Sequence, residues 1–200
     1  MIHKIAKTEV EINEIISKRW SARSFDANKQ ISKTDILSLI EAARWAPSSM
    51  NAQPWRIIVW DKFEDKISYD KAFSCVNEWN QKWVKNAPVL IGIFAADYFD
   101  GKDELNLWSK YDCGAAAMNI LLQATSLGLA THPIGGFNAE KLKQTFAIPS
   151  GYTPVSILIV GYQASEEQLD EPYKERELAA RVRNDINKNF FLNNWGNPIK

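Results

Sequence analysis

The chain has 200 residues, and its 24 lysines and arginines balance its 24 aspartates and glutamates, so the formal net charge at pH 7 is zero. This length suits a single domain over residues 1–200, with enough buried surface for a full hydrophobic core. Zero net charge excludes bulk electrostatic binding to nucleic acid or to an anionic membrane.

The first half of the chain alternates helical and extended patterns. Thr8 and Glu11 have the spacing of a capping box and predict a helix directly after them. Ser32 and Asp35 predict the start of a second helix, which must end before Pro47. An extended segment is expected at 55–60, helical spacing follows at 73–84, and 88–95 has the continuous apolar composition of a strand buried on both faces.

The second half continues the alternation. The longest helix is expected over about 104–127, with Gly128 as its C-terminal cap. A short extended segment at 130–134 precedes a brief helix capped by Asn138, and 154–161 has the composition of a central strand. Leu178, Val182 and Ile186 have the spacing of a final amphipathic helix.

Apolar residues are concentrated in the tail, at 190–195, and the chain has eight tryptophans. Leaving such a tail in water costs roughly 25 cal/mol per Å² of apolar surface. The tail therefore either folds back on its own domain or packs on a second subunit, and the residues alone leave both alternatives open.

Cysteine and histidine are scarce. Cys75 and Cys113 form no CxxC pair, and His3 and His132 are too few for a histidine-rich metal site, so no metal is expected. The longest mostly apolar run, 87–96, is too short to cross a bilayer, and the start lacks the apolar segment of a signal peptide. The sequence therefore predicts a soluble, cytoplasmic protein without membrane contact.

Common catalytic motifs are missing from the sequence. It contains no GxGxxG, no GxxxxGK[ST] and no GxSxG. If the protein is an enzyme, the difficult chemistry belongs to a bound organic cofactor.

Four short segments are candidates for binding such a group. Around Arg19, Ser21 and Arg23, two guanidinium groups and a hydroxyl suit a phosphate, although solvated arginines at a helix end explain the same pattern. The segment 46–55 is a polar loop bounded by prolines, or an ordinary helix-to-strand turn. The Gly-Gly pair in 131–138 lets backbone approach a ligand, or forms a tight turn. Lys174 and Arg176 form a basic pair, or part of a solvated charge run.

Taken in order, these segments resemble the FMN-dependent nitroreductase family, from about residue 14 to about residue 185. The Pro-Ser-Ser-x-Asn-x-Gln-Pro-Trp loop at 47–55 is the most specific part of the resemblance. The resemblance implies an α+β fold with a central mixed or antiparallel sheet flanked by helices. It also implies an intertwined homodimer with two FMN sites at the interface, and a C-terminal tail from about 187 that packs on the partner subunit.

The same resemblance implies the roles of individual residues. The phosphate and ribityl or pyrimidine contacts come from 19–23, and further phosphate contacts come from the C-terminal pair. The loop residues reach the flavin of the other subunit, Gly136 offers its backbone N–H near flavin N5, and Asn80 matches an asparagine at the flavin rim. The expected cofactor-binding residues are Arg19, Trp20, Ser21, Arg23, Pro47, Ser48, Ser49, Asn51, Gln53, Asn80, Pro133, Ile134, Gly135, Gly136, Lys174 and Arg176.

The activity implied is hydride transfer from NADH or NADPH through FMN to nitroaromatics, quinones or similar small acceptors, in ping-pong turnover. No protein acid or base is required for it, and a cation such as Arg23 stabilises the charge that reduction places at the flavin N1–C2=O edge. A flavin-binding or storage module, or a member with another flavin reaction such as dehalogenation or flavin cleavage, is the alternative. Gly135 stands where the best-known nitroreductases have an acidic residue, and 97–111 is expected to select the substrate.

Overall fold

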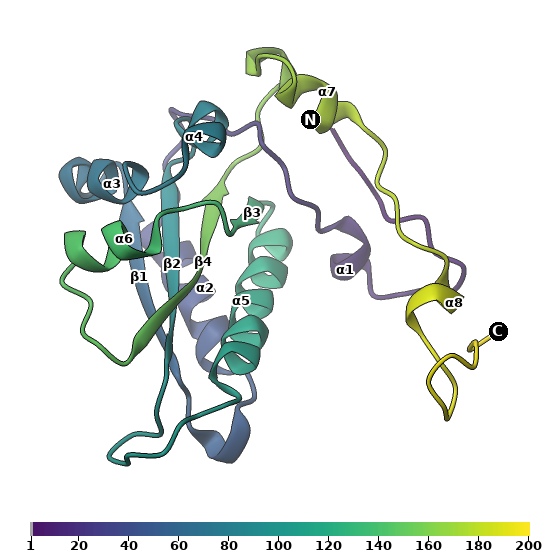
Figure 1. Ribbon diagram of the computed structural model, residues 1–200. Helices are drawn as coiled ribbons and strands as arrows, with labels where there is room; N and C mark the ends of the chain where they lie inside the picture. Colours follow the sequence, from purple (N-terminus) through teal and green to yellow (C-terminus); the bar gives the residue numbers. More distant parts are fainter. Residues whose placement is uncertain (1) are drawn as a thin grey trace.

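Four strands form one antiparallel sheet in the spatial order β1-β2-β4-β3 (Figure 1). The computed structural model describes residues 2–200. The strands are β1 (Trp55–Asp61), β2 (Val89–Ala96), β3 (Ala130–Ile134) and β4 (Tyr152–Gly161). The helices are α1 (Glu14–Lys18), α2 (Lys33–Arg44), η1 (Ser49–Asn51), α3 (Lys66–Phe73), α4 (Glu78–Val84), α5 (Ser109–Ser126), α6 (Ala139–Thr145), η2 (Glu166–Gln168), α7 (Tyr173–Leu178) and α8 (Ile186–Asn189). The expected α+β class with an antiparallel central sheet is confirmed.

The two central strands are apolar on both faces because helices cover both faces of the sheet. Leu90 and Phe94 of β2 point into one cluster with residues of α3, α4 and α6. Ile91 and Ile93, one position along, point into a second cluster with residues of α2 and α5. The alternation follows from the period of two in a strand. The sheet is therefore the middle layer of three, with α3 and α6 on one side and α2 and α5 on the other (Figure 1).

Local capping rules account for the helix ends around the core. Ser32 Oγ accepts the N–H of Asp35 at 3.0 Å and donates to its carboxylate at 2.7 Å, so the helix begins where Ser32 and Asp35 predicted. Gly128 follows the last residues of α5 with φ +71°, as expected of a C-terminal cap. The helix α5 begins later than expected, because the segment before it pairs with the chain leaving β2: Phe99 N–H donates to Glu104 C=O, and Asn106 N–H to Asp97 C=O, each at 2.9 Å.

Both terminal helices were misplaced by the sequence patterns. Thr8 and Glu11 cap no helix, and α1 begins at Glu14 with Asn13 as its cap. The final amphipathic helix is also wrong: α7 ends at Leu178, and the chain is irregular over 179–185. Tertiary hydrogen bonds replace the helical ones there, since Arg181 Nη1 donates to the C=O groups of Lys4 and Ser17.

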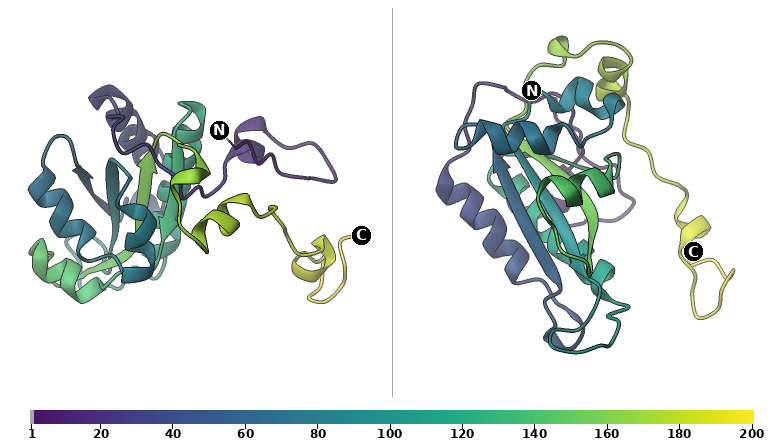
Figure 2. Two further views of the ribbon diagram at one scale, coloured as in Figure 1. Left: turned by 90° about the horizontal axis from the view of Figure 1, so that it is seen from above. Right: turned by 60° about the vertical axis from the view of Figure 1, so that its left-hand side comes forward.

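The two ends of the chain form a pair of arms that project from the sheet on the same side (Figure 2). Lys4 Nζ donates to the C=O of Ala179 at 2.6 Å, which ties the arms together near their bases. The C-terminal arm exposes large apolar side chains, including Trp195 at 93% exposure. Within residues 2–200, no helix is long and apolar enough to cross a membrane.

Candidate functional site

The segment Arg19–Arg23 runs beside β3, which is the last strand of the sheet. Ser21 bridges Thr131 in parallel, and His132 Nδ1 lies 2.9 Å from the C=O of Ala22. Lys4 Nζ lies 4.6 Å from the centroid of the Trp20 ring. The structure thus places the predicted segment around Arg19–Arg23 directly against the predicted segment 131–138, along one edge of the sheet.

His132 itself is packed as a neutral side chain. Its ring lies 4.6 Å from that of Trp83, centroid to centroid. Burial lowers the pKa of His132 to about 4, and the nearby positive charges of Arg23 and Arg19 act in the same direction. At neutral pH the imidazole therefore holds the backbone of 19–23 in place and is not a cationic acid.

Gly136 occupies a position with no room for a side chain. Its C=O accepts the N–H of Asn77 at 3.0 Å and Asn80 Nδ2 at 3.4 Å. A Cβ at Gly136 would lie 2.4 Å from Asn77 Nδ2 and 2.5 Å from Asn80 Nδ2. Asn77 is also held by α4, since its Oδ1 caps the N–H of Asn80 at 2.9 Å. The structure therefore brings Asn80 to Gly136, as expected of two residues of one site.

The other residues of that segment differ in their surroundings. Pro133 and Ile134 belong to β3, where Pro133 is exposed and Ile134 is buried. A Cβ at Gly135 would meet nothing within 4 Å. Of the two glycines, only Gly136 is required by its neighbours.

A basic cluster surrounds Arg19. Arg19, Arg181 and Arg183 line a cavity of about 300 Å³, together with Lys7 and apolar side chains of the N-terminal arm, α1 and α5. The described residues lining it include no aspartate or glutamate. Burial and the two neighbouring arginines lower the pKa of Arg19. Arginines that repel one another around a cavity favour an anion between them.

Arg181 and Arg183 were missed because the sequence pattern assigned them to a helix. In a helix, residues two apart do not face the same direction, whereas in extended chain they do. Once 179–185 is irregular, the Arg-x-Arg spacing brings both guanidinium groups to Arg19.

Lys174 and Arg176 belong to α7 and do not line the cavity of the arginine cluster. Lys174 Nζ forms an ion pair with Glu167 at 2.5 Å, and this contact raises the pKa of Lys174. The Arg176 guanidinium lies 5.2 Å from the Trp79 ring centroid, and the Tyr173 hydroxyl donates to the Trp79 C=O at 2.7 Å. Of this pair, Arg176 lies close enough to Arg23 for its positive charge to lower the pKa of Arg23.

The buried carboxylate of Glu177 joins α7 to the segment beside β3. It accepts the N–H of Arg23 at 2.9 Å and the N–H of Ser24 at 3.3 Å, and none of Glu177 is exposed. Burial raises the pKa of Glu177, and the two N–H bonds and the positive charges of Arg23 and Lys4 oppose that rise. No sequence pattern singled out Glu177, because it stands in a run of charged residues.

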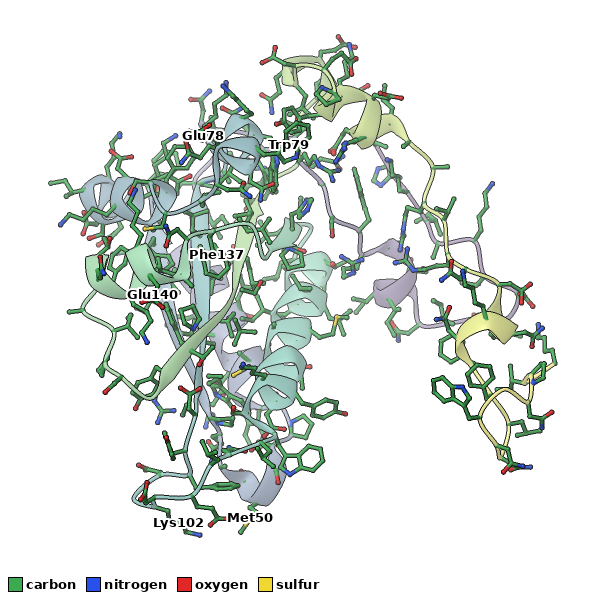
Figure 3. All side chains as sticks on the ribbon, viewed as in Figure 1. Met50, Glu78, Trp79, Lys102, Phe137 and Glu140 are labelled. Carbon is green, nitrogen blue, oxygen red and sulfur yellow. The ribbon has the colours of Figure 1, made fainter. Side chains whose placement is uncertain are left out.

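The loop at 47–53 lies at the opposite end of the sheet. It leads from α2 through η1 into β1, whose first residue Trp55 pairs with Ala95. Ser21, in contrast, bridges Thr131, which is in register with Val160 near the other end. The side chains of Met50 and Trp79 mark the two ends (Figure 3). Within one chain, the loop and Ser21 therefore lie at opposite ends of the sheet, and no loop residue lines the cavity of the basic cluster.

The loop itself is rigidly held. Met50, Asn51 and Gln53 have φ between 46° and 54°, a region that non-glycine residues adopt only when their surroundings enforce it. Gln53 N–H donates to Ser48 Oγ at 3.0 Å, and Ser49 N–H to Asp112 Oδ2 at 3.1 Å. Asp112, 3% exposed on α5, is a second functional candidate that sequence reasoning missed. The sequence signal that could have identified Asp112 is its position as an acidic residue directly before the small and apolar stretch 113–118.

Beside this loop is a cavity of about 480 Å³. It is lined by the start of β1, the hairpin-like segment 97–106 and the start of β4, and its aromatic side chains are Tyr98, Phe99 and Tyr152. The segment expected to select a substrate therefore belongs to the same end of the molecule as Pro47 and its neighbours. Among residues 2–200, no group of three His, Cys, Asp or Glu side chains could hold a metal ion.

This chain is similar to several known proteins. YdgI of Bacillus subtilis (strain 168), named an NAD(P)H nitroreductase, is 29% identical over 194 residues, covering 76% of this chain and 88% of YdgI. A protein of Archaeoglobus fulgidus named an NADH dehydrogenase/NAD(P)H nitroreductase is 32% identical over 165 residues, 80% of this chain and 90% of that protein. A crystal structure described as an oxidoreductase containing FMN is 28% identical, with a TM-score of 0.88 over 96% of both chains.

The model of the nitroreductase family matches residues 16–162, from the start of the basic segment through the whole sheet. Since this match spans more than half of the chain, and the fold is that of an FMN-containing oxidoreductase, the chain belongs to the nitroreductase family.

Proposed function

We propose that this chain is an FMN-dependent oxidoreductase that uses NADH or NADPH to reduce nitroaromatics, quinones or similar small acceptors. The observation that supports it best is that Ser21 and Gly136 lie beside β3, the edge strand of the sheet, while Arg19, two residues before Ser21, belongs to an arginine cluster. A phosphate needs cationic donors without competing acids, and a flat ring needs backbone it can approach closely. Arg19, Arg181 and Arg183 meet the first need. The Gly135-Gly136 segment meets the second, because a Cβ at Gly135 would meet nothing within 4 Å and Gly136 lies beside Asn80.

The protein groups hold and orient the cofactor. The arginine cluster would bind the phosphate, Ser21 and Arg23 the ribityl chain and pyrimidine edge, and Asn80 and Gly136 the rim near N5. When bound, FMN would supply the hydride chemistry between the nicotinamide and the acceptor. Arg23 would stabilise the negative charge of a reduced flavin, and the reaction would need no protein acid or base. His132, neutral at pH 7, contributes only to the placement of the Arg19–Arg23 backbone.

We further propose that two chains form a symmetric dimer, in which the 47–53 loop of each completes the site of the other. The loop and Ser21 lie at opposite ends of one sheet, and the described cavity of the arginine cluster includes no loop residue, so a two-fold axis can bring loop and site together across two chains. Exposed apolar side chains support this, with Trp108, Tyr111 and Met118 on or beside α5 at 58%, 77% and 47% exposure. The tail from about 187 would pack on the partner subunit, and a chain ending at 186 should then dimerise less tightly in sedimentation analysis.

The proposed function is tested with purified protein and added FMN. We expect one FMN per chain, and bleaching of the flavin absorbance by NADH or NADPH without oxygen, followed by reoxidation on addition of a quinone or nitroaromatic. Protein that takes up no FMN would overturn the proposal. Protein that binds FMN but is not bleached by either nicotinamide would be a flavin-binding module.

A further inference from the structure

Glu177 and Asp112 are the two buried acidic side chains among residues 2–200, and none of Glu177 is exposed. It belongs to α7, at the base of the C-terminal arm, and reaches across to the segment beside β3. Both carboxylate oxygens are used there, Oε2 by the N–H of Arg23 and Oε1 by the N–H of Ser24. The contact joins residues more than 150 positions apart in the sequence.

The bonds fall on the part of the chain that sets the direction of the Arg23 side chain. Ser21 and Ala22 are already held by Thr131 and His132 of β3. Glu177 holds the next two residues, so the backbone of 21–24 is fixed from two sides. Arg23 is half-buried, and the Glu177 charge favours its guanidinium form against the cost of burial and the nearby Arg176.

A buried carboxylate costs free energy that a well-packed apolar side chain in the same place would not. Packing alone therefore does not explain a glutamate at this position. What the carboxylate adds is two directed hydrogen bonds and a negative charge beside Arg23, both of which act on one side chain of the proposed flavin site.

We propose that Glu177 is a positioning residue that acts through Arg23, and that it makes flavin binding depend on the placement of the C-terminal arm. The inference rests on the proposed function. The arm is anchored at Glu177 and continues to the tail, so an arm displaced from its place would release Arg23 from its backbone constraint.

The test is a double-mutant cycle on FMN binding, using Glu177→Gln, Arg23→Ala and the double variant. Gln fills the same volume but removes the charge and places an NH₂ group against one of the two N–H donors. We expect each single variant to raise the FMN dissociation constant about tenfold or more, and the double variant to be hardly worse than Arg23→Ala. Glu175→Gln, which removes an exposed acid from the same helix, is the matched control and should leave the constant within about twofold.

The outcomes separate the inference from the proposed function. If the unmodified protein binds no FMN, the proposed function fails. If it binds FMN but the effects of Glu177→Gln and Arg23→Ala multiply, Glu177 has only a structural role and the inference is overturned. If Glu177→Gln does not fold, Glu177→Asp, which keeps the charge but shortens the reach, replaces it in the same cycle. Failure of both to fold would also assign Glu177 to folding and contradict the proposal.

Discussion

The backbone N–H of Ser49 donates to Asp112 Oδ2 at 3.1 Å, and this bond fixes the polar loop after α2 to the buried face of α5. The loop contains three non-glycine residues with positive φ, a conformation that each adopts at a cost of order 1–3 kcal/mol. A buried anchor is what allows the loop to keep that conformation.

Replacing the anchor should loosen the loop. Asp112→Ala leaves the Ser49 N–H without its partner, and we expect unfolding free energy to fall by about 1–3 kcal/mol in urea titrations. Asp112→Asn retains an acceptor oxygen and should lose less. Equal stability of the alanine variant and the unmodified protein would show that the bond does not support the loop.

The arginine cluster and the basic pair on α7 are two candidate binding sites for the phosphate, and substitutions distinguish them. Arg183→Ala should weaken FMN binding by about 10- to 100-fold, because a charge-assisted contact is worth roughly 1.5–3 kcal/mol. Riboflavin, which lacks the phosphate, should bind both proteins alike. Lys174→Ala is the matched comparison, since Lys174 is already paired with Glu167. A larger loss of FMN affinity with Lys174→Ala than with Arg183→Ala would show that the basic pair on α7 binds the phosphate instead.

Gly136 and Gly135 provide a matched pair of substitutions. Gly136→Ala places a Cβ against Asn77 Nδ2 and Asn80 Nδ2, and shifting these amides strains the bonds that Asn77 Oδ1 and Asn80 Nδ2 already make. We expect a loss of about 1–3 kcal/mol in unfolding free energy, as for other overpacked sites. Gly135→Ala, where the added methyl group meets nothing within 4 Å, should change stability by less than about 0.5 kcal/mol. Equal effects of the two substitutions would contradict the tight contact at Gly136.

His132 should make the stability depend on pH. Its pKa is lowered from 6.5 to about 4 in the folded protein, so between these values the unfolded chain binds the proton and the folded one does not. Stability is therefore lost as the pH falls from about 6.5 towards 4, by about 2–3 kcal/mol near pH 4.5. The difference between unmodified protein and His132→Gln in urea titrations at pH 7 and 4.5 isolates this contribution. A difference that does not change with pH would mean that the imidazole titrates normally.

The sequence patterns predicted the sheet and its covering helices because these elements depend on local rules. The strands at 55–60, 88–95, 130–134 and 154–161 were expected within a few residues of their positions. The caps at Ser32, Asn138 and Gly128 were also expected, since short side chains and glycine satisfy helix ends locally.

The arms could not be predicted in the same way, because long-range contacts decide their conformation. Arg181 bonds the backbone of the N-terminal arm, which keeps 179–185 out of a helix and turns Arg183 towards Arg19. Glu177 and Asp112 were missed for a related reason. Each acts on a backbone N–H far away in the sequence, and no spacing rule connects the two positions.

The site shared between subunits is the central claim, and hybrid dimers test it most directly. A chain with Arg19→Ala and Arg183→Ala and a chain with Asn51→Ala should each bind FMN poorly as homodimers. In a hybrid of the two, all the substitutions fall in one site and the other site is intact. We predict that the hybrid binds one FMN per dimer with the affinity of the unmodified protein. A hybrid without any site of unmodified affinity would contradict the shared site.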